Sequence, residues 1–560
     1  MSKQQDKTTR ELQGIRDTVE SVWVAIVLAF VLRAFMIEAF VIPTGSMAPR
    51  LMGEHWNLVC PACGYEYAYG LDRQAGSPGR TQLRTPASAA CPNCSMRYPA
   101  TTHQQYLRGG DRVLVMKYLY NFTDPHPWDV VVFRNPQDNR ENYIKRLIGL
   151  PGETIELVHG DVFVRVGDGP WQIRRKPHEA QEAMWQIVFH NDYQPDMEML
   201  ARQGAAREVP KWVPDGEWET SLQGRRFTFT GDSPSDLVFQ ADEDAFLPHY
   251  GYNQSSPSHQ RFDRQSDVIS DLRLSFVYTP QEAGSSVSMR LTSFEHGFQG
   301  ELCADGTAVI RHDPPDETEG NWEEWGRTQI EPIAPGESRL VALSHVDFRL
   351  TLWVDGQAVL VSSDEQYAAD HEVLIQRMQR VDRQWASLES EDGDEISARR
   401  LLPAEPIPTP QVALAAAGGP CRIDHLKLER DVYYTNSSIA PATYDAGFAR
   451  VVGATSKASG WGTTGRPITL WKFADSPELD QFFLLGDNSP QSHDGRSWTD
   501  AAPTLILYND EGEQVYQLGT VPRCNLIGKA FFVYWPSGYA VPGLPGLPVI
   551  PNVGKMRLIR

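Results

Sequence analysis

An apolar segment stands out near the start of the chain. Residues from Val19 to Phe40 are mostly apolar, with an uninterrupted core from Val22 to Leu32. An amphipathic helix of a soluble domain would carry polar side chains every three or four positions, and this segment does not. A run of this length is also typical of the apolar region of a cleaved signal peptide, but Phe-Val-Ile-Pro follows it in place of small residues. We therefore predict a retained transmembrane anchor over residues 18–39.

The polar flank before this segment predicts its orientation. Residues 1–17 are short and carry Lys3, Lys7, Arg10 and Arg16. Positively charged flanks tend to stay on the cytoplasmic side of a membrane. We expect residues 1–17 to form a cytoplasmic tail, with a single pass through the cell (inner) membrane and all later residues on the extracytoplasmic side.

Beyond the anchor, the alternation of apolar and polar positions predicts a mainly β protein. Such alternation is typical of strands with one buried face. Strands are expected over residues 111–117, 129–133, 143–150, 161–166, 482–485 and 527–534. We predict one β domain assembled from three segments of the chain, at residues 40–59, 104–195 and 440–540. The Pro- and Gly-rich residues 541–560 are expected to form a C-terminal tail.

The long segment between these strands has its own period-two pattern. Apolar side chains alternate from Leu272 to Tyr278 and again from Phe348 to Val354, and Asp-Gly pairs at 305–306 and 355–356 favour hairpin turns. Many short strands joined by turns predict an inserted β-sandwich over residues 196–435. The pattern loosely resembles concanavalin-like jelly rolls, many of which bind glycans. A glycan or protein ligand for this insertion stays open, because no ligand-binding constellation is evident.

The length and charge of the chain limit the number of domains and the kinds of binding partner that we expect. A chain of 560 residues is too long for one core, so several domains are expected. The formal net charge of −20, with no basic cluster to offset it, argues against nucleic-acid binding.

Four cysteines frame another insertion, predicted over residues 60–100. They occur as Cys60-Pro-Ala-Cys63 and Cys91-Pro-Asn-Cys94, and the first knuckle resembles those of zinc ribbons. Four thiolates suit tetrahedral Zn²⁺. The alternative is a pair of disulfides, which an oxidising exterior would favour, with bridges between the knuckles more plausible than strained bridges within one. Either a zinc ion or two disulfides would stabilise the fold of so short a segment.

Candidate chemistry centres on Ser46, which follows a predicted strand and a Gly45 turn. A serine on a tight turn at a strand end is placed like a nucleophile. Two later stretches accompany it: the strand Tyr143-Ile-Lys145-Arg146 and the loop that begins Gly486-Asp487-Asn488. Burial of a lysine beside apolar neighbours lowers its pKa, and a neutral lysine can accept the proton of a serine hydroxyl.

The three stretches, together with Gly110-Asp-Arg-Val in between, resemble the type I signal peptidases, which are membrane-bound Ser/Lys endopeptidases. The resemblance covers residues 18–59, 104–195 and 440–540. It implies Ser46 as nucleophile and Lys145 as general base, with an oxyanion hole formed by the Ser46 N–H and Thr44. The supporting residues that it implies are Ser492, Asp487, Asp494, Arg496 and Arg146, where Ser492 orients the lysine, Asp494 pairs with Arg496, and Asp487 pairs with Arg146.

The same resemblance predicts the substrate and the cofactor requirement. Signal peptides of secretory preproteins would lie extended beside the active site and be cleaved after small residues of the Ala-x-Ala type. The expected substrate-binding residues are Phe40, Ile42, Met47, Tyr143 and Ile144. No cofactor is needed for catalysis, and zinc would be structural, on Cys60, Cys63, Cys91 and Cys94.

Some features depart from the family pattern or leave alternatives. Ser489-Pro490-Gln491 and Gly495 differ from many members in the loop. A triad through His493 is rejected, because adjacent side chains on an extended segment point apart. The rivals are a self-cleaving Ser/Lys protease of the repressor type and a surface binding protein that uses the sandwich on an inactive protease scaffold.

Overall fold

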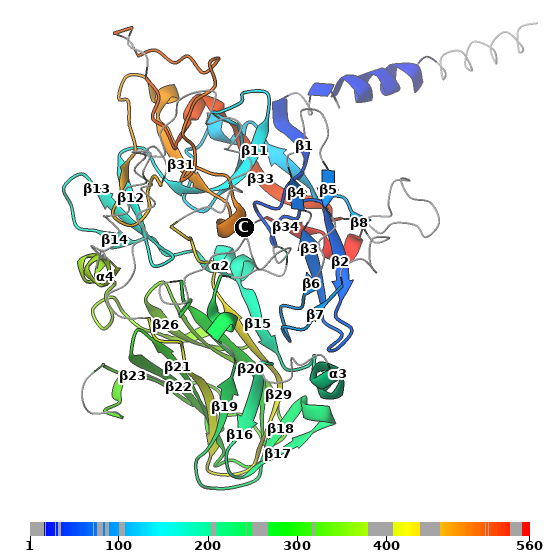
Figure 1. The fold of residues 1–560 in the computed structure, drawn as a ribbon, viewed down its shortest axis with the longest axis vertical. Coiled ribbons are helices and arrows are strands. Elements are labelled where there is room, and N and C mark those ends of the chain that lie inside the picture. Colours follow the sequence, from blue (N-terminus) through cyan, green and yellow to red (C-terminus); the bar gives the residue numbers. More distant parts are fainter. Residues whose placement is uncertain are drawn as a thin grey trace, which may run out of the picture.

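A computed structural model defines the fold of the chain. It describes residues 16–559, apart from 17, 29, 32–34, 71, 75–81, 85–88, 100–106, 203–208, 242, 249–251, 253–266, 316–319, 379–406, 437–459, 510, 513–514 and 538–551. The prediction of a mainly β protein is confirmed. Figure 1 shows the sandwich, mostly in green, below a group of sheets drawn in blue, cyan and orange.

The main sheet of the upper part joins strands from both ends of the chain. Its order is β1-β9-β33-β10-β11-β31-β32, with β34 paired to β33 and every pair antiparallel. The strands are β1 (Ile37–Val41), β9 (Arg112–Met116), β10 (Val130–Arg134), β11 (Asn142–Gly149), β31 (Gln481–Leu485), β32 (Val521–Pro522), β33 (Leu526–Trp535) and β34 (Arg557–Leu558). The neighbours β11 and β31 are separated in sequence by the whole inserted region.

A smaller sheet lies next to this one, in the order β14-β13-β12-β30. Its strands are β12 (Glu153–Val158), β13 (Asp161–Val166), β14 (Gln172–Ile173) and β30 (Ile468–Thr469). Ile155 and Leu157 of β12 pack with Ile148 of β11 and Phe483 of β31 in one buried cluster. The second sheet therefore supports the part of β11 that follows Lys145.

The inserted region forms a two-layered β-sandwich. One layer has the order β17-β18-β29-β20-β25-β26-β27, with β15 also paired to β29, and the other has the order β16-β19-β28-β21-β22-β23-β24. The layers pack face to face, since a Cβ on Gly300 of β22 would lie 2.6 Å from Leu343 Cδ1 of β25. Along β21, half-buried and fully buried positions alternate as expected for a strand that covers a core.

The strands of the sandwich have the following bounds. The first layer contains β15 (Gln186–His190), β17 (Trp218–Ser221), β18 (Arg226–Phe229), β20 (Leu272–Pro280), β25 (Arg339–Val346), β26 (Arg349–Val354), β27 (Gln357–Val361) and β29 (Cys421–Arg430). The second contains β16 (Lys211–Pro214), β19 (Ser235–Gln240), β21 (Ser286–Ser293), β22 (His296–Cys303), β23 (Thr307–Asp313), β24 (Glu323–Gln329) and β28 (Val412–Ala417). Because β15 belongs to this sheet, the sandwich begins before the predicted boundary at residue 196.

The cysteine-framed insertion is built from short strand pairs. These are β2 (His55–Val59), β3 (Glu66–Gly70) and β8 (Leu107–Arg108) in one sheet, β4 (Asp72–Gln74) with β5 (Gln82–Arg84), and β6 (Ala89–Ala90) with β7 (Arg97–Tyr98). Leu200 and Val209, from the start of the inserted region, are part of its buried cluster. The small unit therefore packs against the chain that leads into the sandwich.

Helices are short and peripheral. Among the described residues that follow β1, the α-helices are α2 (His178–Met184), α3 (Met197–Arg202) and α4 (His371–Met378). The 3₁₀ turns are η3 (Leu119–Asn121), η4 (Leu222–Gly224), η5 (Glu243–Phe246), η9 (Pro477–Leu479), η10 (Ser489–Gln491), η11 (Arg523–Asn525) and η12 (Val553–Lys555).

The two ends of the chain differ from the predicted boundaries. Residues 18–28 are helical and extend away from the sheets in Figure 1, while β1 begins at Ile37, inside the predicted anchor. Within the described residues, no helix has both the length and the apolar character needed to cross a membrane. At the other end, β34 lies inside the predicted tail and pairs with β33, where Arg557 Nη2 donates to Asp111 Oδ2 at 3.1 Å.

Candidate active site

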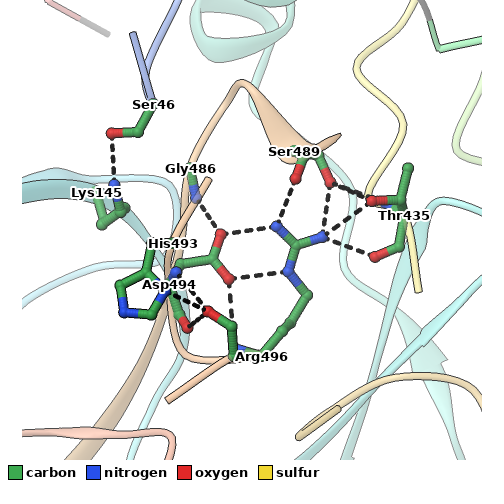
Figure 2. A network of polar contacts seen from close by, with 9 residues as sticks. Ser46, Lys145, Thr435, Gly486, Ser489, His493, Asp494 and Arg496 are labelled. Atoms are coloured by element: carbon green, nitrogen blue, oxygen red, sulfur yellow. Dashed lines mark hydrogen bonds and ion pairs between the residues drawn. The ribbon is translucent and has the colours of Figure 1, made fainter. Parts of the chain in front are cut away.

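Ser46 and Lys145 meet although their strands are not neighbours in the sheet. Ser46 lies in the turn after β1, where Ala48 N donates to Gly45 O at 2.9 Å. Lys145 lies on β11, paired with Val131 of β10. The Lys145 Nζ donates to Ser46 Oγ at 2.5 Å, as Figure 2 shows. Since β9, β33 and β10 lie between β1 and β11 in the strand order, the sheet must curve to bring these two residues together.

Lys145 is buried, with only 3% of its surface exposed. Burial lowers the pKa of Lys145 to about 8, Asp494 and Asp487 raise it, and Arg496 lowers it. A lysine with this pKa is neutral in a substantial fraction of molecules at mildly alkaline pH, whereas an ordinary lysine is almost fully charged there. Its amine is therefore suited to accept the Ser46 proton.

The loop that begins at Gly486 fixes the serine turn. Asn488 N donates to Ser46 O at 3.1 Å, and Asn488 Nδ2 donates to Gly45 O at 2.8 Å. Asn488 is buried. Asn488 is not among the site residues predicted from the sequence, although it belongs to the Gly-Asp-Asn stretch that identifies this loop.

Two buried ion pairs flank the lysine, with the partners that the resemblance implies. Arg146 donates to both carboxylate oxygens of Asp487, at 2.7 Å each. Arg496 donates to Asp494 Oδ1 at 2.9 Å and to Oδ2 at 2.7 Å, and Gly486 N donates to Asp494 Oδ2 at 3.0 Å. Burial alone would raise the pKa of Asp494, but Arg496 and Gly486 hold it below its usual value.

Ser492 does not make the expected contact with Lys145. Its Oγ is buried and has no hydrogen-bond partner among the described residues. The side chain lies against the backbone of Gly486, because a Cβ at that glycine would lie 2.2 Å from Ser492 Oγ. The prediction that Ser492 orients the lysine is therefore wrong for this structure, in which Ser46 is the hydrogen-bond partner of the amine.

The expected substrate-binding residues divide into two groups. Phe40 and Tyr143 are half-buried, and the Lys145 amine lies 5.4 Å from the centre of the Tyr143 ring. Ile42, Met47 and Ile144 are buried, at 2%, 0% and 8% exposure, in a core cluster that includes Leu51 and Val113. Met47 and Ile42 thus offer almost no surface to a substrate, which corrects that part of the prediction.

The remaining site residues lie at the surface or point elsewhere. Thr44 is exposed, and its oxyanion role stays a prediction. His493 contacts Gln137 through Nε2 at 2.6 Å and Ser497 through Nδ1 at 3.0 Å. These partners are consistent with the absence of a triad through His493.

A tyrosine from the insertion also contacts the serine turn. Tyr252 is buried, its hydroxyl donates to Glu54 O at 3.1 Å, and a Cβ on Gly45 would lie 2.1 Å from its Cε1. No local pattern points to Tyr252, because its partners are about two hundred residues away in sequence.

The four knuckle cysteines come together as the spacing predicts. Their sulfur atoms all lie within 4.8 Å of one another, and the separations are 3.6 Å for Cys60–Cys94 and for Cys63–Cys91. Tetrahedral Zn²⁺ with Zn–S bonds of about 2.3 Å places sulfurs roughly 3.8 Å apart. The donor set therefore fits zinc, while a disulfide would need a separation of about 2.05 Å.

The two knuckles also have matching backbones. Cys60 N donates to Tyr65 O and Cys91 N donates to Met96 O, each at 2.9 Å. Gly64 and Ser95 occupy equivalent positions with φ of 75° and 57°. The repeated turn presents both pairs of thiols to one point, as a shared metal ion would require.

Comparison with known proteins finds similarity to signal peptidases over part of the chain. A family model described as "Signal peptidase, peptidase S26" matches residues 94–218 and 463–535, which include Lys145 and the Gly486 loop. The match covers less than half of the chain, and Ser46 lies outside it.

Individual relatives are distant. Signal peptidase I of Rickettsia bellii (strain OSU 85-389) is 27% identical over 139 residues, covering 25% of this chain and 36% of the relative. Signal peptidase I of Pseudomonas fluorescens is 30% identical over 128 residues, covering 23% of this chain and 30% of the relative. The chain thus spans about a third of the length of these curated relatives.

Solved structures with similar folds include proteins of low sequence identity to this chain. The carbohydrate binding module CBM66 from Bacillus subtilis is similar over 39% of this chain and 94% of its own, at 10% identity and a TM-score of 0.23. A likeness at this score supports no functional conclusion.

Proposed function

We propose that the chain is a membrane-anchored signal peptidase, a serine endopeptidase that removes signal peptides from exported preproteins. The observation that carries this proposal is the 2.5 Å contact between Lys145 Nζ and Ser46 Oγ, made by a buried lysine whose pKa is lowered to about 8. A hydroxyl nucleophile beside a neutral amine is a known variant of the serine protease arrangement.

The first chemical step is acylation of Ser46. The neutral Lys145 amine takes the hydroxyl proton as Oγ attacks the scissile carbonyl carbon. The carbonyl oxygen becomes an oxyanion, and the Lys145 ammonium then gives its proton to the leaving amine as the peptide bond breaks. The products are an acyl-enzyme on Ser46 and the free N-terminus of the mature protein.

The oxyanion needs donors at the serine turn. Among the described residues, the Ser46 N–H has no hydrogen-bond acceptor, and the exposed Thr44 lies two residues away. We assign these two groups to the oxyanion hole, where loss of one donor costs about 3–4 kcal/mol in related sites. Lys145 then activates a water that hydrolyses the acyl-enzyme.

The substrate would bind as an added strand. The β11–β31 ladder runs from Arg146 to Gly149, so it does not include Ile144 and Lys145. At the other side of the site, β1 pairs with β9 alone within the described part of the sheet. An extended signal peptide between these strands would use β-augmentation, with Phe40 and Tyr143 as the accessible side chains.

Membrane attachment is part of the proposal. Apolar side chains in the helical residues 18–28 are exposed, including Trp23 at 63% and Val24 at 67%. Exposure of so many apolar groups on one segment suits a lipid environment. The anchor would keep the N-terminus cytoplasmic and the site at the extracytoplasmic membrane surface.

A structural zinc ion is the second part of the proposal. Cys60, Cys63, Cys91 and Cys94 would hold it as thiolates. The ion would cross-link the two Cys-x-x-Cys turns and take no part in peptide cleavage.

The direct test is processing of a purified preprotein with Ala-x-Ala before its cleavage site. Wild-type protein should cut after that site, while Ser46→Ala and Lys145→Ala should each lose at least about a thousandfold in rate. Lys529→Ala, a lysine of β33 paired with Asp129, serves as the matched control. Binding without cleavage by the wild type would support the rival, a binding protein on an inactive scaffold.

A further inference from the structure

Ser489 connects two parts of the molecule that the sequence keeps far apart. It begins η10, directly after the Gly-Asp-Asn turn, and is fully buried. Its Oγ accepts hydrogen bonds from Thr435 N and from Arg496 Nη1, each at 2.8 Å. With both lone pairs occupied, the hydroxyl hydrogen is left for Thr435 Oγ1 at 3.3 Å.

Thr435 belongs to the end of the inserted region. It follows the sandwich strand β29, which ends at Arg430, and it is buried at 4% exposure. Arg496 Nη1 also donates to Thr435 O at 2.7 Å, and Arg496 Nη2 donates to Ser489 O at 2.9 Å. One side of the Arg496 guanidinium is therefore held by the chain that leaves the sandwich.

The other side of the same guanidinium holds Asp494, as Figure 2 shows. Both charges act on the active-site lysine: Asp494 raises the pKa of Lys145 and Arg496 lowers it. The position of Arg496 therefore affects the lysine twice, through its own charge and through how fully it neutralises Asp494.

We infer that Ser489 is a positioning residue through which the inserted sandwich fixes Arg496 and thereby sets the protonation of Lys145. The inference rests on the proposed role of Lys145 as general base. Ser489 touches neither Ser46 nor Lys145 through a hydrogen bond, so it acts through Arg496 and Asp494. The sandwich then influences the protonation of Lys145 through the chain that follows β29.

Ser489→Ala should raise the pKa of Lys145. A less restrained Arg496 neutralises Asp494 less fully, and its own positive charge opposes protonation of the lysine less strongly. We expect kcat near neutral pH to fall about three- to tenfold, with KM within about twofold of wild type. The rising limb of the pH profile of kcat should move to higher pH by about half a unit to one unit. Ser489→Thr, which keeps the hydroxyl, should restore part of both losses.

The matched control is Ser270→Ala. Ser270 is a buried serine of the sandwich whose Oγ accepts a hydrogen bond from Ser293 Oγ at 2.8 Å. Its loss removes a buried hydroxyl of the same kind without touching Arg496. It should lower thermal stability and leave the pH profile unchanged.

A second readout needs no substrate. In protein labelled with ¹³C-lysine, the Cε chemical shift of Lys145, assigned with Lys145→Arg, reports its pKa directly. A pKa that rises in Ser489→Ala and not in Ser270→Ala supports the inference even if no preprotein is cleaved, in which case only the proposed function fails. An unchanged Lys145 pKa in Ser489→Ala, or an equal shift in Ser270→Ala, would overturn the inference.

Discussion

The ring of Tyr252 occupies the space where a side chain on Gly45 would lie. A Cβ on Gly45 would be 2.1 Å from Tyr252 Cε1, well inside van der Waals contact. Tyr252 comes from the inserted region, while Gly45 immediately precedes the candidate nucleophile. The absence of a side chain at residue 45 therefore lets the insertion pack directly on the serine turn.

This contact predicts a compensating pair of substitutions. Gly45→Ala should lower the cleavage rate at least tenfold, because the added methyl group must displace either Tyr252 or Ser46. Tyr252→Ala in the same chain should recover part of the loss by making room. Rates of preprotein cleavage for both single variants and the double variant measure the coupling. Losses that simply multiply in the double variant would contradict the contact.

The strands and the order of the motifs were predictable from sequence, because both depend on local patterns. Alternating apolar positions predict β9, β10, β11, β13, β31 and β33 to within a few residues. Ser46 and the Gly486 loop lie at recognisable turns after strands, and Lys145 lies within a recognisable strand. Their joint resemblance to one family predicts that they meet.

Features that depend on contacts between residues far apart in sequence could not be predicted from local sequence patterns. Tyr252 and Thr435 reach the site only because the sandwich folds back on it. Met47 looks available next to the nucleophile, but the turn after β1 directs it into the core. Likewise, the rotamer and neighbours of Ser492 depend on the packing at Gly486 and not on its spacing from the motif.

The second prediction concerns the energetic cost of the buried lysine. Burial lowers the pKa of Lys145 from its ordinary value of about 10.4 to about 8. Between these pH values the unfolded chain binds a proton that the folded chain does not, so stability rises with pH across this window. Below pH 8 the folded protein bears the full cost, about 3 kcal/mol as an upper value.

Lys145→Met should therefore be inactive and yet more stable than wild type at pH 7, with the difference shrinking towards pH 10. Hydrogen exchange of amides in β11 and β31 measures the local free energy of opening in a protein with several domains. Lys529→Met, at a lysine with 32% side-chain exposure on β33, is the control and should show no such pH-dependent gain. A Lys145→Met protein less stable than wild type at pH 7 would refute the argument.

The third prediction concerns the cysteine cluster. Purified protein should carry about one Zn²⁺ per chain, and Cys63→Ser should lose most of it because three thiolates bind more weakly than four. Cys524→Ser, which changes an exposed cysteine outside the cluster, should keep its zinc. Elemental analysis and thiol titration give both numbers. Absence of zinc together with absence of free thiols at the four positions would indicate disulfides between Cys60 and Cys94 and between Cys63 and Cys91.

The pairing of Ser46 with Lys145 is tested most directly by the pH dependence of kcat/KM for preprotein cleavage. This quantity reports the pKa of the essential base in the free enzyme. Since the lysine must be neutral to act, the rate should rise with pH through a midpoint near 8, the pKa that burial gives Lys145. A midpoint near 10.4, the value of an ordinary lysine, or substantial cleavage by Lys145→Ala near neutral pH, would contradict the account.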